Sequence, residues 1–170
     1  MQRDRLVKGI DGKPSLRKSW KKSGRKVILV DGKQNKKISV SIGRRERVLV
    51  MDDDPYVGSL IRDLLKDSGY YALVTKNGVE AIEHFKAAEI HGDSFDAVIL
   101  DLHVHSGMGG DQALKKLRDI DPDVKAILLT ADICHSAVSD YELLGFKSTI
   151  IKPFTRHDLQ QALDRALGTM

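Results

Sequence analysis

Three consecutive carboxylates, Asp52, Asp53 and Asp54, directly follow the apolar run VLVM at residues 48–51. Two like charges about 4 Å apart repel each other by about 4 kcal/mol at an effective dielectric constant of about 20. Such a cluster therefore needs a partner that offsets the repulsion. Two or three convergent carboxylates form a site of hard oxygen ligands, which suits Mg²⁺.

Three further polar residues, Asp101, Thr130 and Lys152, stand at the ends of later apolar runs. A carboxylate can form an acyl phosphate, and a metal ion, a cation and a hydroxyl group together can hold a phosphoryl group. Each residue also has an ordinary explanation, since an Asp after a strand often caps the next helix. Their combination favours a site for phosphoryl chemistry. Asp54 and Pro55, in contrast, fit the start of a helix.

The elements that must position these residues follow from the apolar pattern after residue 46. Apolar runs predict five strands, at residues 47–51, 71–75, 95–100, 124–130 and 148–151. Apolar residues that recur at i, i+3, i+4 and i+7 predict helices between and after the strands. The predicted helices cover residues 55–68, 78–88, a segment around 113–117, 134–144 and 159–167.

Strands that alternate with helices form right-handed crossovers, so the sequence predicts a doubly wound α/β fold with a parallel sheet covered on both faces. In such sheets ligands bind beyond the C-terminal ends of the strands. The polar residues described above all fall at that edge.

The charge of the chain divides it into two parts. Residues 1–47 carry 16 Lys and Arg against 4 Asp and Glu, a net charge of +12, whereas residues 48–170 carry 12 against 20, a net charge of −8. We expect residues 1–45 to be a basic arm, with the first 25 residues disordered, or the remnant of a preceding domain. A hairpin of residues 26–30 and 38–42 is expected within it. Residues 46–170 are expected to form the folded domain.

Two features concern the compartment. No apolar run approaches the roughly 20 residues of a membrane span, so we expect no membrane contact. The single cysteine, Cys134, excludes an internal disulfide and fits a reducing compartment, with the cytoplasm as the default.

Residues 46–167 resemble the receiver domain of two-component response regulators. The resemblance rests on an ordered set of motifs: VLVMDDDP (48–55), VILDL (98–102), LLTA (128–131) and IIKPF (150–154). It implies a flavodoxin-like (βα)5 fold with strand order 2-1-3-4-5. It also implies a phosphoprotein of phosphorelay signalling that changes conformation on phosphorylation and turns over no external substrate.

The resemblance further implies how the phosphoryl group arrives and which residues bind the metal. Asp101 would accept the phosphoryl group from a phosphohistidine on a histidine kinase or a histidine phosphotransfer protein. Asp53 would bind Mg²⁺ directly, Asp52 would bind it directly or through water, and Asp101 would belong to the same metal site. The backbone carbonyl of His103 would be a further ligand.

Other residues of the motifs would handle the phosphate. The resemblance assigns Thr130 and Ala131 to phosphate binding and switching, and Lys152 to an ion pair with the acceptor and then with the phosphate. The Lys152–Pro153 peptide bond is cis in the family. His103 and Asp132 occupy positions that tune the removal of the phosphoryl group by water.

The sequence departs from the family at three points. His105 stands where the family usually has proline, and the loop LHVHSGMGG (102–110) looks like that of receivers attached to hybrid histidine kinases. Thr149 replaces the aromatic residue that usually rotates as a readout of phosphorylation. Only three residues follow Leu167, so we expect no C-terminal DNA-binding effector.

Two other functions stay open beside the phosphoacceptor module. The first is a phosphohydrolase of the haloacid dehalogenase type, since Asp52 and Asp54 have the Asp-x-Asp spacing, but Asp101 would then be unexplained. The second is a non-phosphorylated interaction module whose basic arm binds nucleic acid; nucleic acid contact is expected only through this arm. A homodimer through the face formed by helix 4, strand 5 and helix 5 of the receiver is a further expectation.

Overall fold

The computed structural model describes residues 44–105, 107–132 and 140–169, and before residue 43 only the backbone of four strands. Cys134 and most of the helix predicted for residues 134–144 lie outside the described residues. The chain divides into two compact units, Met1–Arg45 and Glu46–Met170, and each is described by itself.

The first unit contains an antiparallel sheet with the order β1-β2-β3-β4. Its strands are β1 (Arg5–Leu6), β2 (Leu16–Trp20), β3 (Arg25–Val30) and β4 (Lys37–Ile42). The pairing of β3 with β4 is the predicted hairpin. Strands β1 and β2 lie where composition predicts disorder. A prediction from composition takes no account of the backbone pairing of β2 with residues 25–29 of β3.

The second unit contains a parallel sheet with the order β6-β5-β7-β8-β9, which confirms the predicted order 2-1-3-4-5. Its strands are β5 (Arg47–Met51), β6 (Tyr71–Thr75), β7 (Ala97–Asp101), β8 (Ala126–Thr130) and β9 (Ser148–Ile151). Strands β7 and β8 begin two residues later than predicted. The reason is that Phe95 and Val124 are buried in the core but precede the strand ladder.

Helices follow each strand of this sheet: α1 (Pro55–Asp67), α2 (Gly78–His91), α3 (Gly110–Ile120), the short α5 (Tyr141–Leu144) and α6 (Arg156–Leu167). Asp54 caps α1, because its carboxylate accepts the N–H of Tyr56 at 2.8 Å. Pro55 is the first residue of that helix, as predicted. Gly145 ends α5 in the left-handed conformation, with φ 97°.

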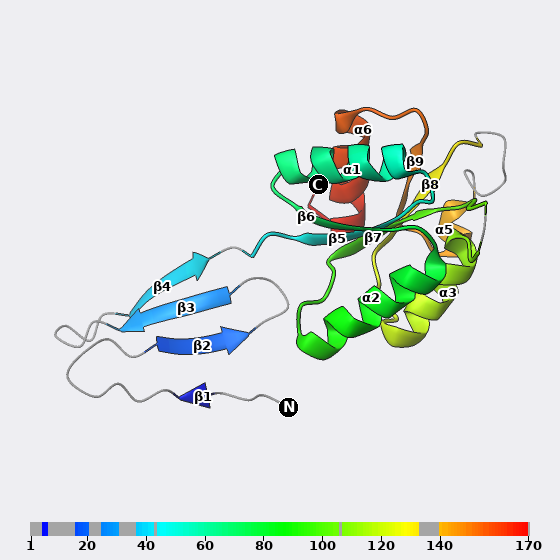
Figure 1. Ribbon diagram of the computed structural model, residues 1–170. Coiled ribbons are helices and arrows are strands. Elements are labelled where there is room, and N and C mark those ends of the chain that lie inside the picture. The colour runs from blue at the N-terminus through cyan, green and yellow to red at the C-terminus, as the bar shows by residue number, and fades with distance from the viewer. Residues whose placement is uncertain are drawn as a thin grey trace. The chain divides into compact units, whose positions relative to one another are not determined.

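The helices cover the sheet on both faces (Figure 1). Helices α1 and α6 pack against one face, in a cluster that includes Ile61 and Leu163. Helices α2 and α3 pack against the other face, where Phe85 and Leu117 lie in the second cluster. Every residue of β7 and β8 is buried, which makes these central strands a rigid platform for the residues at their ends. Among the described residues, no helix is long and apolar enough to cross a membrane.

Residues 46–170 should fold without residues 1–45, because both core clusters are built from residues 48–167. A fragment that begins at Glu46 is expected to unfold in one cooperative thermal transition, followed by far-ultraviolet circular dichroism. A broad, non-cooperative melt of this fragment would show that the first unit is needed for its core.

Candidate functional site

The sheet holds the candidate residues together at its C-terminal edge. Backbone hydrogen bonds continue past the strand ends: Asp52 N–H donates to the carbonyl of Thr75 at 3.0 Å, and Lys152 N–H to the carbonyl of Thr130 at 2.8 Å. These bonds fix the backbone from which the side chains project. Because β5 and β7 are neighbours in the sheet, their terminal carboxylates meet.

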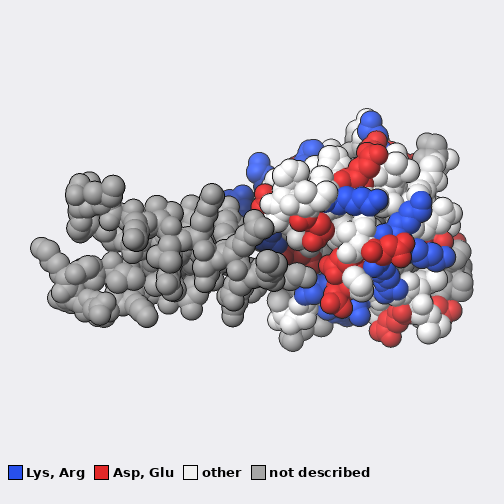
Figure 2. Space-filling model, turned by 90° about the horizontal axis from the view of Figure 1, so that it is seen from below, with Lys and Arg blue, Asp and Glu red and all other residues white. Residues whose placement is uncertain are grey.

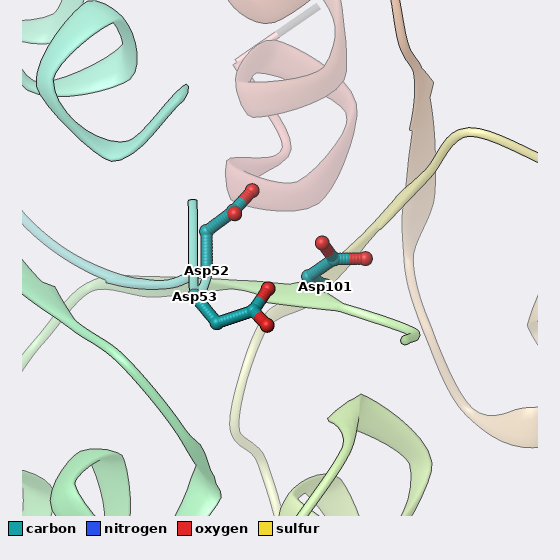
Figure 3. A group of neighbouring side chains, drawn as sticks. All are labelled: Asp52, Asp53 and Asp101. Atoms are coloured by element: carbon teal, nitrogen blue, oxygen red, sulfur yellow. The ribbon is translucent and has the colours of Figure 1, made fainter. Parts of the chain in front are cut away.

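Carboxylate oxygens of Asp52, Asp53 and Asp101 lie within 4.8 Å of one another. Figure 3 shows the three side chains at the ends of neighbouring strands. Asp52 and Asp101 are buried, and Asp53 is partly buried. Asp54 does not join them, since its carboxylate caps α1. An Asp52–Asp54 pair, which the phosphohydrolase hypothesis requires, is therefore not formed.

Lys152 connects two of the three acids. Its Nζ lies 2.6 Å from Oδ2 of Asp101 and 2.8 Å from Oδ2 of Asp52. Burial by itself favours the neutral amine, but the hydrogen bond to Asp101 and the pairing with Asp52 outweigh burial and raise the pKa of Lys152 above its ordinary value. The lysine is therefore a fixed positive charge in the site.

Asp52 keeps unused capacity to bind a cation. Its Oδ1 accepts the N–H of Asp54 at 2.9 Å. Its Oδ2 is buried and faces Lys152, but accepts no hydrogen bond of good geometry. Burial raises the pKa of this carboxyl above its ordinary value despite the nearby lysine. An under-satisfied buried oxygen beside two further carboxylates fits a small, hard cation such as Mg²⁺.

Asp53 is held by the loop that follows β7. Its Oδ2 accepts the backbone N–H of His105 at 2.7 Å and lies 2.9 Å from Nδ1 of the same residue. The backbone hydrogen bond is the main reason why the pKa of Asp53 lies below its ordinary value; partial burial opposes it, and the imidazole adds to it. This role of His105 is not among those expected from the sequence. The available signal was the departure from proline, which has no N–H to donate.

The remaining predicted residues surround the acids. Thr130 is fully buried at the end of β8, and its hydroxyl oxygen accepts the N–H of Asp132 at 3.1 Å. Ala131 and Asp132 are exposed. His103 donates its backbone N–H to Oδ1 of Asp101 at 3.2 Å, while its side chain is exposed. The Lys152–Pro153 peptide bond is cis, as expected.

Comparison with known proteins gives one consistent family. Residues 48–164 match the family described as the response regulator receiver domain. The chain is 30% identical over 123 residues to the chemotaxis protein CheY of Bacillus subtilis, covering 72% of this chain and 98% of that protein. It is 25% identical over 122 residues to sporulation initiation phosphotransferase F of the same organism, covering 72% and 94%.

Solved structures agree on the fold. A response regulator receiver domain protein from Clostridium thermocellum has a TM-score of 0.65 at 25% identity and covers 73% of this chain and 95% of that one. The receiver domain of a sensor histidine kinase from Pseudomonas aeruginosa, solved with magnesium coordinated in its active-site cleft, has a TM-score of 0.64 at 24% identity and covers 74% and 99%.

Replacing Asp52 with Asn should stabilise the metal-free protein. A raised folded-state pKa means that the native state binds this proton more tightly than the unfolded state. The contribution of Asp52 to stability therefore falls as pH rises through the interval between the two pKa values, and the whole penalty is present above the folded-state pKa. We expect Asp52→Asn to raise the Tm in EDTA by a few °C, because the amide has no charge to bury. The stabilisation by added Mg²⁺ should be lost.

Thermal melts with and without Mg²⁺ check this expectation. Asp119→Asn is the matched control, because Asp119 is an exposed carboxylate on α3; it should leave both effects unchanged. A lower Tm of Asp52→Asn in EDTA would contradict the assigned cost of burying the Asp52 charge.

Proposed function

Because the chain belongs to the response regulator receiver family, we propose that it acts as a phosphoacceptor module in two-component signalling, with Asp101 as the acceptor. The observation that carries this proposal is the placement of Asp101: its carboxylate lies beside two other acids and is paired with Lys152 at 2.6 Å. The donor would be a phosphohistidine on a histidine kinase or on a histidine phosphotransfer protein. The module would turn over no external substrate.

Each site residue then has a part in the transfer. One oxygen of the Asp101 carboxylate attacks the phosphorus atom, and the phosphohistidine nitrogen leaves. Asp52, Asp53, Asp101 and the carbonyl of His103 would hold Mg²⁺, which neutralises charge on the phosphoryl oxygens. Lys152, now bound to Asp101, is positioned to pair with the phosphoryl group once it is attached.

Thr130 and Ala131 would read the new phosphate. The hydroxyl oxygen of Thr130 accepts the N–H of Asp132, so its own proton is available for donation to a phosphate oxygen. This donation would draw the end of β8 toward Asp101. The aromatic side chain that usually rotates with this movement in the family is replaced by Thr149, which is partly buried. His103 and Asp132 would set how quickly water removes the phosphoryl group.

The domain assignment and the compartment are also proposals. We assign the receiver function to residues 46–170, and we regard residues 1–45 as a basic arm or the remnant of a preceding domain. Nucleic acid would be contacted through the arm alone, because residues 48–170 carry a net charge of −8. Lys and Arg are interspersed with Asp and Glu on the face of the second unit shown in Figure 2. A reducing, cytoplasmic setting is supported by the single cysteine.

Acetyl phosphate tests the acceptor directly. Incubation with acetyl phosphate and Mg²⁺ should add the mass of one phosphoryl group, measured on the intact protein. Asp101→Asn should abolish the gain, because an amide cannot form the acyl phosphate, and Lys152→Ala should reduce it strongly. Asp119→Asn is the control and should be labelled like the wild type. Labelling that persists in Asp101→Asn would refute the assignment of the acceptor.

Three exposed apolar side chains support a homodimer through α5, β9 and α6. Leu143 is 87% exposed, Leu144 is 41% exposed and Ile151 on the edge strand is 36% exposed. We expect acetyl phosphate to convert the wild type to a dimer in size-exclusion chromatography with light scattering. Leu143→Glu should stay monomeric, because it places a charge in the apolar contact. Ile90→Glu is the control, since Ile90 is 82% exposed on α2. Dimerisation of Leu143→Glu would rule out this face.

A further inference from the structure

His105 gives Asp53 two hydrogen-bond donors from one residue. The backbone N–H and the ring Nδ1 both reach Oδ2 of Asp53, at 2.7 and 2.9 Å. Both the neutral imidazole protonated at Nδ1 and the imidazolium can donate from this nitrogen. The two residues are 52 positions apart in the chain, so the contact joins the loop after β7 to the end of β5.

This contact depends on the residue type at position 105. A proline there, which the family usually has, would lack both the N–H and the ring donor. The His105 side chain is 97% exposed, and its ring Nδ1 lies 2.9 Å from Oδ2 of Asp53. Through this contact the imidazole can affect the acidic site.

The hydrogen bonds engage only one of the two oxygens of Asp53. With two N–H groups on Oδ2, the lone pairs of that oxygen are occupied, and Oδ1 is left to face a cation. In the structure that contains this contact, oxygens of the three acids already converge within 4.8 Å. The clamped orientation of Asp53 is thus compatible with metal binding and does not compete with it.

We propose that His105 is a positioning residue for the metal site: it fixes the carboxylate of Asp53 so that one oxygen is presented to Mg²⁺. The proposal rests on the proposed function, since it concerns the same metal site. Residues that hold a ligand by hydrogen bonds commonly strengthen metal binding, because the ligand loses less freedom when the metal arrives. The imidazole acts on the metal through Asp53 and does not itself coordinate it.

Isothermal titration of the full-length protein with Mg²⁺ tests the proposal through affinity alone. His105→Ala keeps the backbone N–H but loses the ring donor, and its Kd for Mg²⁺ should rise about three- to tenfold, at or below the usual range for such positioning residues. His105→Pro loses both donors and should bind more weakly still. His105→Asn should restore nearly wild-type affinity, because its side-chain amide N–H can replace Nδ1–H.

Matched controls separate the outcomes. His91→Ala removes another exposed histidine, on α2, and should leave the Kd unchanged. Wild-type protein that binds no Mg²⁺ would overturn the proposed metal site itself. If the wild type binds Mg²⁺ and His105→Ala binds it equally well or more tightly, only the positioning role is overturned. Tighter binding by the variant would show that the imidazole competes with the metal. Failure of His105→Asn to restore the affinity would also contradict the positioning role, because the side-chain hydrogen bond to Asp53 would then not account for the affinity.

Discussion

The contact of Lys152 with Asp101 and Asp52 is the constraint on which the site depends. Two buried carboxylates at the ends of adjacent strands would repel each other strongly in a medium of low dielectric. The lysine that offsets this repulsion directly follows β9, which lies two strands away from β7 across β8. The strand order therefore decides which residues meet. Asp52 and Asp101 meet because β5 and β7 are neighbours, and Lys152 reaches them from the far side of β8.

The same arrangement explains why the site is costly to the fold. Asp52 is buried, and its pKa lies above the ordinary value because burial outweighs the hydrogen bonds that favour the charged form. A neutral residue there would suit the folded protein better, but it could not supply a charged oxygen to a cation. An unfavourable residue of this kind is typical of functional sites, and the rest of the core must supply the stability that the site costs. Here the fully buried strands β7 and β8 provide that core.

Much of this could be predicted from the sequence, because the signals are local. Apolar runs gave β5, β6 and β9 with their observed bounds, and Asp54 with Pro55 marked the start of α1. The Asp52, Asp53 and Asp101 cluster followed from the rule that strand ends meet at one edge. The contact of His105 with Asp53 could not be predicted this way. It depends on the path of the loop after β7, which neither hydrophobic periodicity nor secondary-structure propensity predicts.

The three adjacent aspartates that begin this site now have three different environments. Asp54 is satisfied by the N-terminus of a helix and takes no part in the cluster. Burial makes Asp52 harder to ionise and the nearby lysine only partly offsets this, whereas Asp53 is held by the N–H groups of a loop residue and is easier to ionise. The pKa of Asp52 is raised and that of its neighbour Asp53 is lowered, because the two side chains have different partners in the fold. Repulsion within the run is offset separately at each residue, by a helix, a lysine and a loop. Only Asp52 and Asp53 remain to join Asp101 from the neighbouring strand.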